Sequence, residues 1–124
     1  MSNHVEADAV KKVIQDYIDG TYYADIPKLQ GVFHEKAVMN GFLGSDLLFA
    51  DPSPFIADIS GSPSMESNKD PYNAEIKSIV VEGNIASVAL YETGFRGTAS
   101  MVDFFHLLKT DGAWKIVSKL FTTL

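Results

Sequence analysis

The sequence predicts an α+β fold in which helices come first and pack on one face of a curved antiparallel sheet. Apolar residues recur at helical spacing in the N-terminal part of the 124-residue chain. Residues 73–124 read instead as two successive β-hairpins, and the second is marked by Asp111-Gly112, a strong hairpin turn signal. No internal linker or repeat divides the chain, so we expect one domain over residues 1–124.

The first predicted helix carries an apolar stripe at spacings of three and four, formed by Val10, Val13, Ile14, Tyr17 and Ile18. Gly20 follows the stripe and is a candidate stop signal. A second, shorter helix is expected to begin at Asp25, a good N-cap, with Pro27 in its first turn.

Short strands are predicted near residues 37–42 and 44–50. A third helix is then expected, with Asp51 as its cap and Pro52 in first position. Residues 60–71 are polar and interrupted by Pro and Gly, which predicts a mobile loop. The strands 73–82 and 84–95 follow, joined at Gly83-Asn84.

The last hairpin raises the main functional question, because Asp103 lies inside its most apolar part. With a two-residue turn, Leu107 is expected opposite Ile116, and Asp103 opposite Leu120. Asp103 then lies on the apolar, core-facing side, and His106 on the other side.

Three explanations for Asp103 stay open. It is a structural acid satisfied by a lysine or by backbone donors, or it lines a wet pocket and binds or activates a ligand, or the register slips by one residue and exposes it. Strict alternation turns Lys119 away from Asp103. A β-bulge would turn Lys119 inward, where it would favour a salt bridge or an anion site.

Composition excludes several classes of function. The net charge of −6, with ten scattered basic residues, argues against nucleic acid and anionic membrane as partners. No cysteine is present, which rules out disulfides and thiolate chemistry. We see neither a signal peptide nor an apolar run near the ~20 residues that cross a bilayer, and we expect a cytoplasmic protein.

No motif indicates a metal or a cofactor. The three histidines lack metal-ligand spacing, and no phosphate-binding loop, nucleophile elbow or serine triad motif occurs. We therefore predict no metal and no cofactor.

Two stretches, "DYIDGTYYADIPKLQGVFHEKAVMNGF" and "VDFFHLLKTDGAWKIVSKLF", resemble the nuclear transport factor 2-like superfamily. The resemblance covers nearly the whole chain and is greatest to the small bacterial "putative lumazine-binding" and SnoaL-like branch. It implies a cone-shaped, cystatin-like fold, in which a strongly curved antiparallel sheet wraps around N-terminal helices and leaves a cavity. It also implies a homodimer, often formed through the sheets.

The resemblance also implies site residues. Relatives include ketosteroid isomerase, scytalone dehydratase and polyketide cyclases as well as binding modules, so the fold does not decide the function. An acid on a late strand and a tyrosine on the first helix often share the cavity, and Asp103 and Tyr17 match them. In ketosteroid isomerase a protonated Asp donates a hydrogen bond beside a Tyr. Asp25 is better explained as a helix cap than as a second, general-base carboxylate.

Three hypotheses for function follow. The first is a small-molecule-binding domain for a partly apolar organic ligand. The second is a cofactor-independent isomerase, dehydratase or cyclase that uses Asp103 for proton transfer, with Tyr17 assisting. The third is a dimerisation module with a filled core. The expected ligand-binding residues are Tyr17, Phe33, Phe55, Tyr91, Asp103, Phe105 and Lys119.

Overall fold

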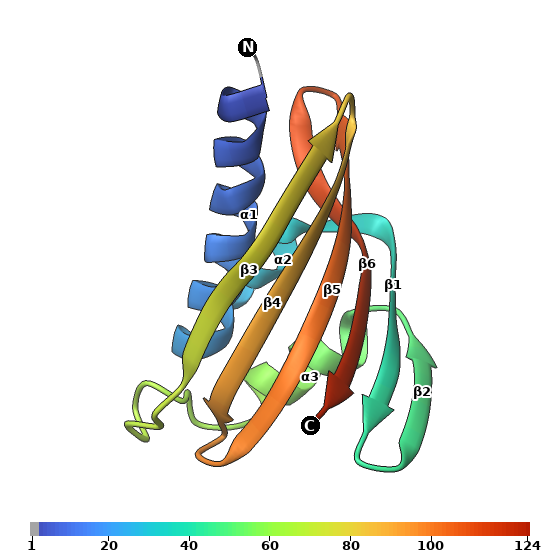
Figure 1. Ribbon diagram of the computed structural model, residues 1–124. Coiled ribbons are helices and arrows are strands. Elements are labelled where there is room, and N and C mark those ends of the chain that lie inside the picture. The colour runs from blue at the N-terminus through green and yellow to red at the C-terminus, as the bar shows by residue number, and fades with distance from the viewer. Residues whose placement is uncertain (1–2) are drawn as a thin grey trace.

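The computed structural model describes residues 3–124 as helices followed by a long, curved sheet (Figure 1). Its helices are α1 (Asn3–Tyr23), α2 (Ile26–Val32) and α3 (Ser53–Ser60). Its strands are β1 (Phe33–Leu43), β2 (Asp46–Ala50), β3 (Asn73–Glu82), β4 (Ile85–Phe95), β5 (Ala99–Thr110) and β6 (Ala113–Thr123). The predicted α+β class is confirmed.

The sheet has the strand order β2-β1-β6-β5-β4-β3. Every neighbouring pair is antiparallel except β1 and β6, which run parallel. The expected antiparallel sheet is therefore corrected at this one pair. A parallel pair needs a long crossover connection, and here the chain passes through α3 and four other strands before β6 returns beside β1.

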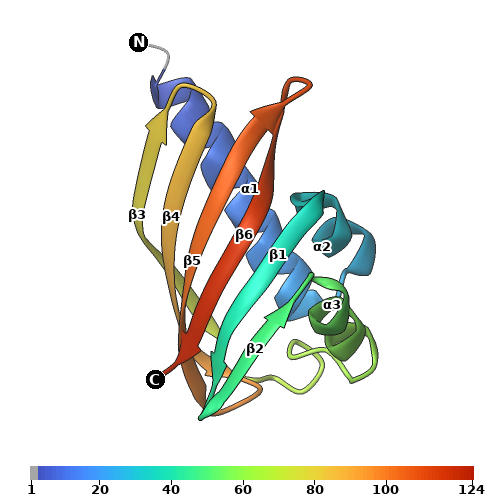
Figure 2. The same ribbon diagram turned by 90° about the vertical axis from the view of Figure 1, so that its right-hand side faces the viewer.

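Helix α1 lies across the concave face of the sheet, while the opposite face carries no helix in the described part of the chain (Figure 2). The apolar stripe predicted for α1 faces this sheet, and Val10, Ile14 and Tyr17 are buried. Gly20 does not end α1, which continues to Tyr23. Gly20 instead lets α2 approach closely, because a Cβ there would lie 3.1 Å from the backbone nitrogen and the Cβ of Leu29.

Asp25 caps α2 as predicted, and its Oδ1 accepts a hydrogen bond from the backbone N–H of Lys28. The segment between α3 and β3 forms neither helix nor strand, in agreement with the predicted loop. It is nevertheless anchored to the fold. The Met65 side chain is buried, and its Sδ accepts a hydrogen bond from the backbone N–H of Arg96 at 3.3 Å.

The β5–β6 hairpin turns at Asp111-Gly112 as predicted, and both residues have the positive φ angles of a two-residue turn. Leu107 pairs with Ile116, also as predicted. Beyond this pair a β-bulge shifts the register by one residue, so that Asp103 pairs with Phe121 rather than with Leu120. The bulge turns Lys119 to the core-facing side, where it pairs with Phe105.

The face of the sheet opposite α1 is rich in exposed apolar side chains. The largest of them include Phe42, Phe49, Val80, Tyr91, Phe104 and Leu120. His106 is also exposed on this face, as the alternation along β5 predicts. Helices α1 to α3 are all too short or too polar to cross a membrane.

Candidate ligand cavity

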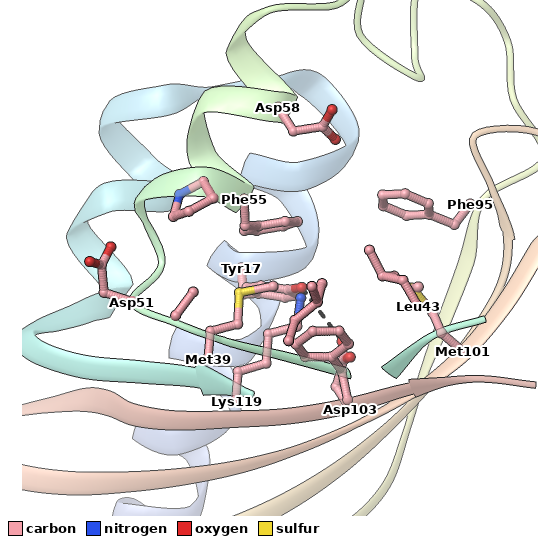
Figure 3. Close-up of a pocket in the computed structure, with 14 residues that line it drawn as sticks. Tyr17, Met39, Leu43, Asp51, Phe55, Asp58, Phe95, Met101, Asp103 and Lys119 are labelled. Carbon is pink, nitrogen blue, oxygen red and sulfur yellow. Dashed lines mark hydrogen bonds between the residues drawn. The ribbon is translucent and has the colours of Figure 1, made fainter. Parts of the chain in front are cut away.

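A cavity of about 200 Å³ opens between α3, the end of α1 and the concave side of the sheet (Figure 3). Its walls are mainly apolar and include Met39, Leu43, Leu48, Phe95, Met101 and Phe121. Five residues with polar side chains line it. Tyr17 from α1, Asp103 from β5 and Lys119 from β6 lie on one side, and Asp51 and Asp58 lie on the side of α3. The cavity thus combines an apolar body with a few convergent polar groups, which is typical of a ligand site.

Asp103 lies at the floor of the cavity and is completely buried. The explanation in which a register slip exposes it is therefore wrong. The Tyr17 hydroxyl donates a hydrogen bond to its Oδ2 at 3.5 Å (Figure 3). Local sequence patterns could not decide whether Asp103 has a lysine partner or lines a wet pocket. The described part of the chain contains no ion pair between Asp103 and Lys119.

Glu92 lies beside Asp103 on the neighbouring strand. Leu90 of β4 pairs with Asp103, and Glu92 pairs with Met101, so the two acids are diagonal neighbours on one face of the sheet. Glu92 is buried, and the Tyr72 hydroxyl donates a hydrogen bond to its Oε2. Burial, followed by the hydrogen bond and the charge of Asp103, raises the pKa of Glu92 well above its ordinary value.

Each of the two acids has one buried carboxyl oxygen without a hydrogen-bond donor among the described residues. Within residues 3–124, Oε1 of Glu92 and Oδ1 of Asp103 are buried and find no donor from another residue. A buried carboxylate oxygen without a donor is costly, and a hydrogen bond between two carboxyl groups requires that one of them be protonated. The raised pKa of Glu92 favours its protonated form, which can donate to Asp103.

The two tyrosines remain hydrogen-bond donors over the whole physiological range. Burial is the main reason that the pKa values of Tyr17 and Tyr72 are raised, and the nearby acids add to it. Each acid therefore keeps a tyrosine donor, Tyr72 for Glu92 and Tyr17 for Asp103, and Tyr17 and Asp103 line the cavity.

Lys119 contributes the one cationic group among the cavity-lining residues. Its side chain is 3% exposed, and its Nζ lies 4.0 Å from the centroid of the Phe55 ring and 5.1 Å from that of Tyr17. These distances fit cation–π contacts. The bulge in β6 is what brings this lysine into the cavity instead of onto the outer face.

The cavity brings together four of the seven residues expected to bind ligand: Tyr17, Phe55, Asp103 and Lys119. Phe33 and Phe105 contact the Tyr17 ring edge-on and support it from behind, but they do not line the cavity. The expectation for Tyr91 is corrected, because Tyr91 is 42% exposed on the opposite face of the sheet.

Glu92 and Tyr72 were not predicted from the sequence as residues of the site. Alternation along β4 contained the signal for Glu92, since Val88, Leu90 and Glu92 share one face and Tyr91 points to the other. Tyr72 had no such signal, because it precedes β3 in an irregular segment. The part of the chain from residue 3 onward holds no group of three His, Cys, Asp or Glu residues arranged for a metal ion.

Comparison with known proteins agrees with this architecture. A family model described as "Putative lumazine-binding" matches residues 5–122. The chain belongs to this family. Its fold is that of the nuclear transport factor 2-like superfamily, which confirms the resemblance seen in the sequence.

Two solved structures illustrate the likeness. A nuclear transport factor 2-like protein of unknown function from Silicibacter pomeroyi DSS-3 is 26% identical, with a TM-score of 0.88 and coverage of 100% of both chains. A ketosteroid isomerase-like protein from Erwinia carotovora atroseptica is 19% identical, with a TM-score of 0.67 and 96% coverage of both chains, and it shows the shared fold alone. A search of the curated proteins finds no match.

Proposed function

We propose that this family member binds a small, partly apolar organic molecule in the cavity, with Asp103 and Tyr17 as its polar contacts. The observation that carries the proposal is the combination of an open cavity and a completely buried carboxyl group at its floor. A dimerisation module with a filled core would have neither an open cavity nor a need for a buried acid there.

The size and lining of the cavity limit the ligand. At about 200 Å³, the cavity is below the roughly 300–1,000 Å³ typical of sites for drug-sized molecules. The ligand is therefore a compact molecule. The aromatic and aliphatic walls favour an apolar body, and the polar groups favour at least one oxygen or nitrogen at the end that reaches the sheet.

A thermal-shift screen of compact aromatic and alicyclic compounds tests this proposal. A ligand that binds only the native state raises the melting temperature. We expect stabilising compounds to lose their effect in Asp103→Asn and to keep it in Asp111→Asn, a matched control at the exposed hairpin turn. If no compound stabilises the wild type, or if the two variants respond alike, binding at Asp103 is contradicted.

A second candidate function is cofactor-independent proton transfer, as in an isomerase, dehydratase or cyclase. The observation that favours it is the buried carboxyl pair, because strongly shifted pKa values gather at catalytic sites. Once a converted compound is known, Asp103→Asn separates the two functions. Retained binding with lost turnover supports proton transfer by Asp103, whereas unchanged turnover rejects it.

We also propose that two copies of the chain associate through the face of the sheet opposite α1. Phe104 and Leu120 pair across β5 and β6 on this face and are 48% and 53% exposed. A contiguous exposed apolar surface is typical of an interaction site. The resemblance that implies a sheet-to-sheet homodimer supports the same face.

A further inference from the structure

Lys119 carries a buried positive charge without a protein acceptor. Within residues 3–124 its ammonium group makes no hydrogen bond and no ion pair, although only 3% of the residue is exposed. Its nearest partners are ring faces, with the centroids of Phe55 and Phe121 at 4.0 Å and 5.5 Å from Nζ. Ring faces attract the charge, but they do not replace the three hydrogen bonds that an ammonium group donates.

The unused donors of Lys119 face the cavity. Lys119 is one of the residues that line it, and Figure 3 shows its side chain extending from the sheet towards Tyr17 and Phe55. A buried charge is stable only when a counter-charge or strong hydrogen bonds compensate it. An acceptor supplied from inside the cavity would provide both.

The nearby acids do not supply this acceptor. Asp103 accepts a hydrogen bond from Tyr17, and Glu92 accepts one from Tyr72. No oxygen of either acid lies within 4.0 Å of the Lys119 ammonium in the described residues. The positive charge of Lys119 nevertheless acts on Glu92. It lowers the pKa of Glu92, although burial raises that pKa by more.

We propose that Lys119 binds an anionic oxygen of the ligand. The cavity then selects compact apolar monoacids, in the form of carboxylates or enolates, over neutral analogues. This inference rests on the proposed ligand-binding function and names the chemical class of the ligand. The anionic oxygen lies on the Lys119 ammonium, and the apolar body packs on Phe55 and the walls formed by Met101 and Phe95.

The same surroundings exclude a second anionic group. A dicarboxylate would place its other charge either against the apolar walls or beside the acids that line the cavity, Asp51, Asp58 and Asp103. Both positions are unfavourable, the first through desolvation and the second through like-charge repulsion. The ligand therefore carries one anionic end only.

Matched pairs of a carboxylate and its carboxamide test the inference directly. Benzoate with benzamide, phenylacetate with phenylacetamide and cinnamate with cinnamamide keep shape and size nearly constant while the charge changes. Their affinities are measured by thermal shift and by calorimetric titration on the wild type, on Lys119→Met and on Lys36→Met. Lys36 is exposed on β1 and serves as the control for loss of one positive charge.

We expect at least one carboxylate to stabilise the wild type and the Lys36→Met variant, while its amide binds at least tenfold more weakly. We expect Lys119→Met to lose the preference for the acid. Circular dichroism shows whether Lys119→Met folds. If it does not fold, the comparison of acid with amide on the wild type still tests the preference for the acid.

The outcomes separate this inference from the function on which it rests. Amides that bind as well as acids, or an acid preference that survives in folded Lys119→Met, overturn the role of Lys119 and leave ligand binding intact. Failure of all six probes, with binding of other neutral compounds, overturns the monoacid class alone. Failure of every compound overturns both proposals.

Discussion

Glu92 and Asp103 are diagonal neighbours on β4 and β5, and both carboxyl groups are buried on the core-facing side of the sheet. Each acid has a tyrosine on its other side, Tyr72 for Glu92 and Tyr17 for Asp103. Burial and the neighbouring Asp103 raise the pKa of Glu92, which favours its neutral form and reduces the charge that the fold must bury.

The first prediction concerns the pH dependence of stability in Glu92→Gln. Native Glu92 keeps its proton above pH 4.5, the ordinary pKa at which an unfolded glutamate loses it. Between that value and the raised native pKa, the native protein binds more protons than the unfolded chain. The contribution of Glu92 to the free energy of unfolding is thus complete at low pH and falls as pH rises, by up to about 1.4 kcal/mol per pH unit.

Glutamine removes this titration but still accepts from Tyr72 and donates to Asp103. Urea denaturation across pH 4.5 to 8 should therefore show a shallower fall of stability with pH in Glu92→Gln than in the wild type. Parallel curves for the two proteins would contradict a protonated Glu92 in the native state.

The second prediction concerns the hydroxyl group of Tyr17. Tyr17→Phe keeps the ring stacked on Phe55 but removes the donor to Asp103. We expect a loss of about 0.5–1.5 kcal/mol in the free energy of unfolding, towards the lower end because the bond is 3.5 Å long. Urea denaturation measures it, and Tyr23→Phe at an exposed tyrosine is the control. Equal stability of the two variants would show that the hydroxyl does not serve Asp103.

The third prediction concerns Gly94, where β4 approaches the segment that leads to Tyr72. Gly94 has a φ of +68°, and a Cβ there would lie 2.0 Å from the carbonyl oxygen of Pro71. Gly83 has a similar φ of +54° but open space around it. We expect Gly83→Ala to cost about 1–2 kcal/mol from backbone strain alone. Gly94→Ala should cost more, because it also pushes Pro71 and Tyr72 away from Glu92.

Thermal and urea denaturation compare the two glycine variants. Equal losses would mean that the backbone at Pro71 gives way without cost. In that case the close packing of this segment would not be what holds Tyr72 against Glu92.

The fourth prediction concerns the proposed dimer. Phe104→Glu places a charge in the exposed apolar face of the sheet, and we expect it to convert a dimer into a monomer in light scattering at micromolar concentration. Val5→Glu is the matched control, because Val5 is 70% exposed on α1, away from that face. A wild-type protein with monomer mass contradicts the proposal.

Local patterns were sufficient to predict most of the fold. The stripe on α1, the cap at Asp25 and the turn at Asp111-Gly112 each depend on a few neighbouring residues, and the structure has all three. The parallel pairing of β1 with β6 joins segments about 80 residues apart, and no local pattern encodes it. The prediction that Gly20 ends the first helix was wrong, because the role of Gly20 depends on its close approach to Leu29 of another helix.

The site was predictable only in part, for the same reason. Asp103 and Tyr17 were identified, but the position of Lys119 depended on a bulge that strict alternation does not include. Alternation along β4 was not used in the prediction. It would have placed Glu92 on the same face as Asp103 and Tyr91 on the outer face. Tyr72 reaches Glu92 through an irregular segment, which tertiary packing alone positions.

The location of the bound ligand tests the central claim most directly. ¹⁵N-labelled protein is titrated with the compound that stabilises it most, and the changes in amide chemical shift are mapped on the structure. The account predicts that they cluster at Tyr17, Phe55, Asp103 and Lys119 around the cavity. Changes confined to the outer face of the sheet, around Tyr91 and Phe104, would contradict it.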